Sequence, residues 1–160
     1  MERAKLVTES LLSRFTTAQE QCYEQVIAEL GEGKKTSHWM WYIFPQIFGL
    51  GFSEYSKYYG IKGFAEADAY WCHPLLKARY EECLNLILNS QKSAEDVLGH
   101  IDAKKLQSSI TLFLEIDKTS ELLSTAIDSL YLGNKDPHTL TILADSVAHK
   151  SHSSQYPDLE

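Results

Sequence analysis

The chain has 160 residues, 44% of them hydrophobic, which is enough to bury the core of one domain without help from disulfides or metals. Its formal net charge of -7 argues against a protein that binds nucleic acid over its whole surface, because neutralising phosphates needs a basic face. The three cysteines show no paired C-x-x-C spacing, which excludes a zinc ribbon or a dithiol redox motif and favours reduced thiols.

The first residues, Met1 to Lys5, are largely charged, and no apolar block follows that could serve as a secretory signal or a membrane span. We therefore expect a cytoplasmic protein with neither a membrane nor a nucleic acid as partner. No set of side chains has the spacing of a metal site, and no cofactor fingerprint is present, so neither a metal nor a cofactor is expected.

Apolar residues recur at three- and four-residue steps over residues 8–30, which predicts an amphipathic helix that ends at the glycines following it. A short second helix is predicted through His38 to Phe44. Thr36 or Ser37 is expected to cap its start, and Pro45 must end it, because the residue before a proline is pushed out of helical geometry.

The rest of the chain predicts further helices, separated by glycines, prolines and capping residues. No stretch shows sustained strand alternation. In chain order, the further helical segments are expected over residues 53–59, 64–71, 74–89, 93–99, 102–115, with Asp102 as cap, 119–131 and from Pro137 through 143. We expect an all-α fold: a single compact bundle of about six to eight short and medium helices over residues 1–146, followed by a flexible polar tail over 147–160.

The segment Ser37-His38-Trp39-Met40-Trp41 gathers an unusual number of aromatic rings around a single imidazole. From the residues alone, two interpretations stay open. Trp and Tyr pack cores with their polar ends satisfied, and a histidine among them is commonly a hydrogen-bonded core residue. Alternatively, the glycine-rich stretch 48–53 leads into a helix start whose amides can hold an anion, while the rings stack a planar group. His38 is then the candidate general acid or base.

A second set of polar residues is expected on one face of a later helix, where Lys105, Ser108, Ser109 and Leu112 come together. If that face meets the His38 segment, Lys105 could pair an anionic group while a serine donates to it or to the imidazole. The alternative is that the two serines bond back to the preceding turn of their own helix and permit close packing.

Seven motifs stand out along the chain. They are Leu12-x-Arg14-Phe15-x-x-Ala18-Gln19, Lys35-x-Ser37-His38-Trp39-Met40-Trp41-x-Ile43-Phe44-Pro45-Gln46, Gly49-Leu50-Gly51-x-Ser53, Tyr59-Gly60-Ile61, His73-Pro74, Asp102-x-x-Lys105-Leu106-x-Ser108-Ser109-x-Thr111-Leu112-Phe113 and Asp136-Pro137-x-Thr139-Leu140. Together these motifs resemble domain-of-unknown-function family number 1810, over about residues 11–143. That resemblance implies a compact all-helical fold like that of a mycobacterial hypothetical protein, and no established activity. The chain departs from the family pattern at Gln107 and Ile110, and the first change removes a positive charge beside Ser108.

Together with the resemblance, the residues predict a pocket for a small anionic or nucleotide-like ligand centred on Ser37 to Trp41. One alternative is a non-enzymatic adaptor that presents an acidic helical surface to a protein partner, with the motif serving only as core. Another is a hydrolase or transferase that uses His38 with Ser109 or Asp102. The expected ligand-binding residues are Arg14, Lys35, Trp39, Trp41, Gln46, Tyr59, Lys105, Ser108 and Ser109, with His38 as the catalytic candidate.

Overall fold

The computed structural model describes the backbone of residues 2–153 and the side chains of residues 10–147, and in this part of the chain the fold is all-α. No strand forms there, and the sole β-type pairing is one isolated bridge between Ile47 and Ile61. The nine helices of these residues are α1 (Glu2–Gly31), α2 (Met40–Ile43), α3 (Glu54–Tyr59), α4 (Phe64–Cys72), α5 (Pro74–Asn89), α6 (Ala94–Leu98), α7 (His100–Ile116), α8 (Glu121–Tyr131) and α9 (Pro137–Ser153).

The helix boundaries follow the capping chemistry of the sequence in most places. Pro74 begins α5, and the His73 side chain accepts the Leu76 backbone N–H as its cap. Ser93 and Ser120 cap α6 and α8 in the same way. The prediction for Asp102 was wrong, because α7 begins two residues earlier at His100 and the Asp102 carboxylate forms ion pairs instead.

Helix α1 begins at Glu2, several residues before the predicted start, because residues 2–7 contain no glycine or proline to interrupt it. It ends at Gly31 as predicted, and Gly33 then takes a φ of +77°, which favours glycine. The second helix is shorter than predicted. Only Met40 to Ile43 are helical, because the Ser37 hydroxyl bonds to Glu29 of α1 rather than capping the turn.

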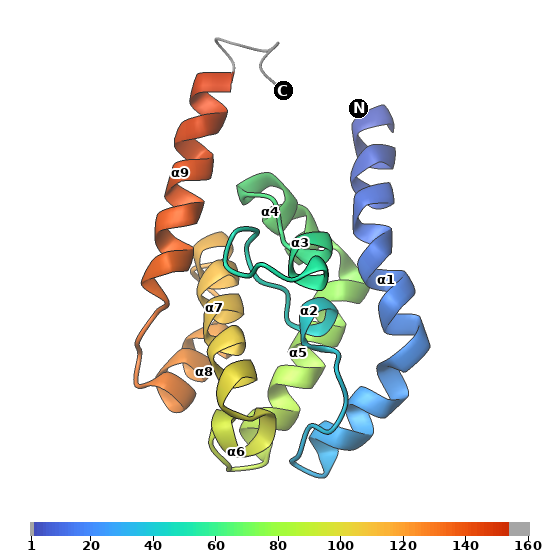
Figure 1. The fold of residues 1–160 in the computed structure, drawn as a ribbon, viewed down its shortest axis with the longest axis vertical. Helices are drawn as coiled ribbons and strands as arrows, with labels where there is room; N and C mark the ends of the chain where they lie inside the picture. Colours follow the sequence, from blue (N-terminus) through green and yellow to red (C-terminus); the bar gives the residue numbers. More distant parts are fainter. Residues whose placement is uncertain (1, 154–160) are drawn as a thin grey trace.

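Helix α7 lies at the centre of the bundle and contacts α4, α6, α8 and α9 (Figure 1). Every residue from Ser108 to Leu114 is buried, so this stretch of α7 is enclosed on all sides. Helices α1 and α9 run along opposite sides of the molecule, and α1 packs mainly on α5. The short helices α2 and α3 lie between α1 and α7, and this position brings the aromatic segment Ser37 to Trp41 close to both (Figure 1).

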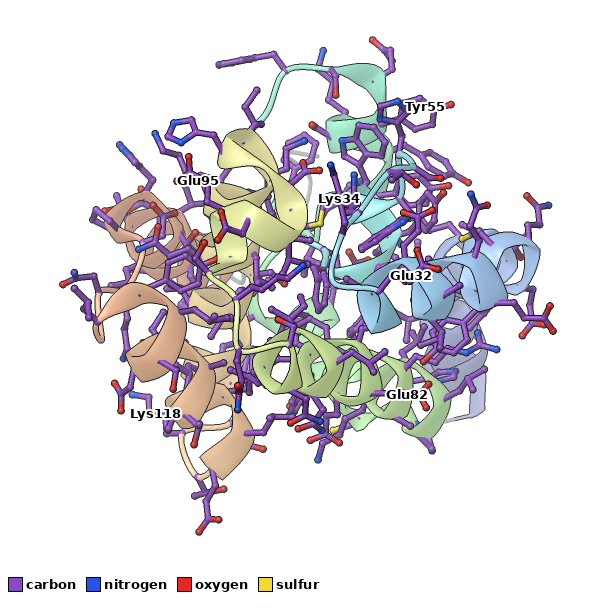
Figure 2. All side chains as sticks on the ribbon, turned by 90° about the horizontal axis from the view of Figure 1, so that it is seen from below. Glu32, Lys34, Tyr55, Glu82, Glu95 and Lys118 are labelled. Atoms are coloured by element: carbon purple, nitrogen blue, oxygen red, sulfur yellow. The ribbon has the colours of Figure 1, made fainter. Side chains whose placement is uncertain are left out.

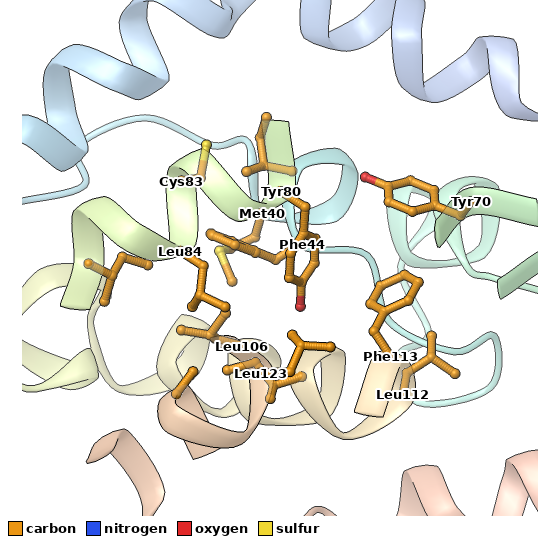
Figure 3. Packing of buried hydrophobic residues seen from close by; sticks show 14 of the residues in the cluster. Met40, Phe44, Tyr70, Tyr80, Cys83, Leu84, Leu106, Leu112, Phe113 and Leu123 are labelled. Carbon is orange, nitrogen blue, oxygen red and sulfur yellow. The ribbon is translucent and has the colours of Figure 1, made fainter. Parts of the chain in front are cut away.

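The core is built around interlocking aromatic rings from α4, α5 and α7 (Figure 3). The Tyr80 ring packs edge-on against Phe44, Trp71 and Phe113, with centroids 5.0–5.2 Å apart. Its hydroxyl points toward α7 and forms a 2.9 Å hydrogen bond with the Ser109 hydroxyl. A buried aromatic side chain of this kind stabilises the fold by about 1.5–3 kcal/mol, provided that its polar end is paired.

The buried amide of Gln19 joins four helices at one point. Its nitrogen donates to the Tyr42 carbonyl at 2.7 Å and lies 3.4 Å from the Tyr70 hydroxyl, and its oxygen accepts from Arg79 at 3.3 Å. Because a buried polar group without partners costs free energy, these bonds fix how α1 sits against α2, α4 and α5.

The last helix, α9, opens at Pro137 as predicted and continues to Ser153. It therefore extends past residue 146, where the domain was expected to end, and residues 154–160 lie outside the described part of the chain. The flexibility expected for residues 147–160 stays a prediction. Within residues 2–153, none of the helices combines the length and apolar character needed to cross a membrane.

Candidate functional site

The segment Ser37 to Trp41 is organised by one buried carboxylate, that of Glu29 near the end of α1. Glu29 Oε1 accepts the backbone N–H groups of Thr36 and Ser37, at 2.8 and 3.0 Å, and the indole N–H of Trp39 at 3.0 Å. Its second oxygen accepts the Ser37 hydroxyl at 2.7 Å. The carboxylate thus takes up four donors, which shapes the turn that leads from α1 into α2.

The same contacts hold Glu29 in its ionised form. Burial raises the pKa of this carboxyl, but the hydrogen bond from the Ser37 hydroxyl and those from the other three donors outweigh that effect. Together they lower the pKa from its ordinary 4.5 to about 2. At neutral pH the Glu29 carboxylate is therefore ionised and accepts all four of these hydrogen bonds. This is the chemistry of a structural group rather than of a group that transfers protons.

Two predicted lysines lie beside the aromatic segment and are already paired with α7. Lys35 Nζ is 2.7 Å from Asp102, its side chain is buried, and it lies over the Trp39 ring at 5.1 Å. Lys105 Nζ is 3.6 Å from the same carboxylate and lies over the Trp41 ring at 5.0 Å. The structure thus brings Lys35, Trp39, Trp41 and Lys105 together around Asp102.

Trp39 and Trp41 differ in what covers them. Trp39 is fully buried, with its N–H on Glu29, so it belongs to the core. Trp41 is half-buried and contacts both the Lys105 ammonium and the Tyr55 ring, which stacks on it at 4.9 Å with an interplanar angle of 26°. Its indole N–H is buried and, among the described residues, has no hydrogen-bond partner.

A groove with a volume of about 880 Å³ lies near this segment, between α1 and α3. Tyrosine rings and short hydroxyl-bearing side chains line it, together with Lys57 on α3 and Lys62 just after α3. The residues that line it are Ser10, Leu11, Ser13, Arg14, Thr17, Ala18, Gln21, Cys22, Tyr42, Tyr55, Lys57, Tyr58, Tyr59, Lys62 and Glu66. We call this hollow the α1–α3 groove.

Arg14 lines the α1–α3 groove but its donors are occupied. Its Nε donates to the Tyr58 carbonyl at 2.9 Å, and its Nη2 donates to the Gly60 carbonyl and to Glu66 at 3.2 and 2.8 Å. Arg14 therefore ties the end of α3 to α1. Among the described groove residues, Lys57 and Lys62 are the cations outside any ion pair.

Two tyrosines of the groove, Tyr42 and Tyr59, keep neutral hydroxyls at physiological pH. Burial raises the pKa of Tyr42 well above the ordinary value of 10 and also raises the pKa of Tyr59. The Tyr59 ring packs against Tyr42 and Phe15, whereas Tyr55 and Tyr58 are 58% and 60% exposed. A wall of this kind can stack a planar group and donate hydrogen bonds to it.

The other predicted residues lie outside the α1–α3 groove. The His38 side chain is exposed, at the edge of the turn before α2. Ser108 donates to the Lys104 carbonyl and to Asp136 at the start of α9, and Ser109 is fully buried against Tyr80. Ser108 thus bonds back to the preceding turn of its own helix, which was one of the two alternatives for these serines. No hydrogen bond among the described residues joins either serine to His38.

Gln46 lies close to Trp41. Both line a small cavity shared with Ser56 and Tyr59, and the Gln46 carbonyl accepts the Ile61 N–H in the isolated bridge. Apart from His38, Ser108 and Ser109, the predicted residues lie in two neighbouring places, with Arg14 and Tyr59 in the groove and Lys35, Trp39, Trp41, Gln46 and Lys105 beside it. The stacked pair of Trp41 and Tyr55 connects the two.

Sequence reasoning missed Glu29, Tyr42 and Tyr55 as contributors to this region. A signal for Glu29 was present, because it follows Val26 by three residues on the stripe of α1 that faces the core. Nothing comparable points to Tyr55, whose partner Trp41 depends on how residues 48–60 fold back.

A family model described as "Protein of unknown function (DUF1810)" matches residues 9–143. Among solved structures, the chain is similar to the crystal structure of the conserved hypothetical protein Rv1873 from Mycobacterium tuberculosis, with 40% sequence identity and a TM-score of 0.81. That match covers 83% of this chain and 96% of the mycobacterial one. No curated protein matches the chain.

Proposed function

The chain belongs to the DUF1810 family, and from that premise we propose that it is a small-molecule-binding domain whose ligand, a planar anion such as a nucleotide, occupies the α1–α3 groove. The observation that carries the proposal is the make-up of the groove wall, in which four tyrosines stand beside two lysines that no ion pair neutralises. The groove volume, about 880 Å³, is within the usual range for small-molecule sites.

The groove supports this ligand class through two complementary kinds of contact. The exposed ring of Tyr58 provides a face for a planar group. Lys57 and Lys62 provide charge for a phosphate or carboxylate, while the acidic Glu66 is neutralised by Arg14 at 2.8 Å. The excess of positive charge is local, which fits a small anion on a chain whose formal net charge is -7.

We further propose that this binding takes place in the cytoplasm. Cys22, Cys72 and Cys83 are all free thiols in the structure, and burial raises the pKa of Cys22, which keeps that thiol protonated and unreactive at the groove wall. A reducing compartment supports three thiols in this state.

The test uses adenosine monophosphate, with adenosine and inorganic phosphate as separate arms. Binding to the native state raises the melting temperature by mass action, and a ligand at 100 times its Kd stabilises the fold by about 2.7 kcal/mol. We expect the monophosphate to raise the melting temperature more than either fragment. A response to phosphate alone would limit the proposal to an anion site, and no response across nucleotides and other planar anions would overturn it.

The matched control compares two double variants with the same loss of charge. Lys57→Gln with Lys62→Gln removes the groove cations, whereas Lys104→Gln with Lys118→Gln removes two exposed lysines elsewhere. Figure 2 shows Lys118 on the other side of the molecule from Tyr55. We expect the first variant to weaken binding of the monophosphate and the second to leave it unchanged. Equal affinities would place the ligand outside the groove.

A further inference from the structure

Residues 48–60 fold as a loop whose two ends are held together by backbone hydrogen bonds. The Phe48 N–H donates to Ile61 at 2.7 Å, and the Ile61 N–H donates to Gln46 at 2.9 Å. The helix within this loop, α3, has no buried residue. A compact loop closed at its base and weakly buried along its length can move as a unit. We call it the 48–60 loop.

The two halves of α3 are attached to the body unequally. At its C-terminal end, Arg14 binds the Tyr58 and Gly60 carbonyls, and Tyr59 packs against Phe15. At its N-terminal end, Tyr55 stacks on Trp41 while remaining 58% exposed. Because more than half of the Tyr55 side chain is already exposed, moving it away exposes little additional apolar surface of Tyr55 itself.

The Trp41 side chain, on which Tyr55 stacks, has an N–H left unpaired by the described residues and a small cavity beside it. Its indole N–H is buried without a partner among the described residues, although such groups are almost always satisfied in folded proteins. The ring borders a cavity of about 10 Å³, shared with Gln46 and Ser56, with room for one water. The Lys105 ammonium lies 5.0 Å from the centroid of the Trp41 ring, a contact with α7 that does not depend on Tyr55.

We propose that Trp41 is a stacking site for a planar heteroaromatic ring, and that Tyr55 occupies the position of that ring until the ligand displaces it. The ligand ring stacks on the face of Trp41 that Tyr55 covers. The inference rests on the proposed function, because Tyr55 also forms part of the α1–α3 groove wall and a ligand in the groove reaches Trp41 by moving it.

The chain offers a matched pair of variants for the test. Tyr55 and Tyr58 lie on the same helix, line the same groove and are equally exposed, but the Tyr58 ring packs edge-on against Tyr59 rather than on Trp41. In the ligand-free protein, we expect Tyr55→Ala to increase acrylamide quenching of Trp41, measured as the difference from a Trp41→Phe background. Tyr58→Ala should leave that quenching unchanged. An unchanged value in Tyr55→Ala would overturn the proposal.

The binding test uses flavin mononucleotide, a planar anionic heteroaromatic compound whose fluorescence is quenched when it stacks on tryptophan. Tyr55→Ala is expected to bind it about tenfold more tightly than the wild type, the factor that one ring stacked on another supplies. Tyr58→Ala should bind it no more tightly than the wild type. The gain should vanish when Trp41→Leu, which removes the aromatic face, is added to the Tyr55→Ala variant.

The outcomes separate this inference from the proposed function. Equal effects of Tyr55→Ala and Tyr58→Ala, or a gain that persists without Trp41, would overturn the stacking site and leave the groove unaffected. A gain in Tyr55→Ala that does not respond to Lys57→Gln with Lys62→Gln would keep the stacking site and overturn the anion groove.

Discussion

Lys105 lies over the face of Trp41, with its Nζ 5.0 Å from the ring centroid, and so joins the central helix α7 to the aromatic segment before it. The ammonium is also 3.6 Å from Asp102, which in turn pairs with Lys35 at 2.7 Å. One carboxylate therefore positions two lysines, each over a different tryptophan.

Replacing Lys105 by Gln should destabilise the fold by about 0.5–1 kcal/mol, the contribution of a partly exposed cation over an aromatic ring. The free energy of unfolding from urea denaturation measures this loss. Lys104→Gln, at an exposed neighbouring position, provides the control and should change the stability by less. Equal losses in the two variants would show that the ring contact contributes nothing.

The Glu29 carboxylate predicts a specific acid sensitivity. Its pKa of about 2 in the folded protein is below the ordinary 4.5, so its stabilising contribution is complete above about pH 4.5 and is lost as the pH falls toward 2. The shift corresponds to at most about 3 kcal/mol. Glu29→Gln should remove this part of the pH dependence and lower the stability at pH 7 by about 1–3 kcal/mol, because Gln leaves donors unpaired.

Unfolding curves at pH 7, 4 and 3 measure both effects, and the near-ultraviolet signal of Trp39 reports the local change. The control is Glu32→Gln, an exposed carboxylate just beyond the same helix (Figure 2). If Glu29→Gln kept the acid sensitivity of the wild type, the hydrogen bonds to its carboxylate would not be what lowers the pKa.

Gly60 marks a place where two segments approach too closely for a side chain. A Cβ there would lie 2.9 Å from Phe48 Cα and 2.9 Å from the Ser56 carbonyl oxygen, although the φ of -60° suits any residue. Gly60→Ala should therefore cost about 1–3 kcal/mol through overpacking. Gly31→Ala is the control: it meets nothing within 4 Å and should be neutral or stabilising by about 0.5–1 kcal/mol. Matching effects on thermal unfolding would contradict the steric explanation.

The fold was predictable from the sequence because its signals are local. Gly31 ends α1 and Pro74 opens α5, and each depends on the conformational limits of one residue. Where a capping prediction was wrong, the residue bonds instead to a partner outside the helix that it was expected to cap. Either Thr36 or Ser37 was expected to cap α2, but the backbone of Thr36 and the hydroxyl of Ser37 both bond to Glu29. Asp102 was expected to cap α7 but pairs with Lys35 from 67 residues earlier.

The candidate site was only partly predictable for the same reason. The cluster of Lys35, Trp41 and Lys105 was expected to meet and does. The two serines of α7 were expected on the same face as Lys105. Their side chains instead meet α9 and α5, because that stretch of α7 is surrounded by other helices and has no outward face to offer. The periodicity of the sequence shows which residues share one face of a helix. Which other helix packs against that face depends on the whole fold.

The amide of Gln19 has a consequence for the order of events during synthesis. Its partner Arg79 is 60 residues further along the chain, and a ribosome adds about 5–20 residues per second. About 3–12 s therefore separate the appearance of the amide from that of the guanidinium that completes its bonding. During this interval α1 has been made but α5, the helix on which it mainly packs, is not yet complete. The apolar residues of α1 are therefore exposed to solvent and to other molecules.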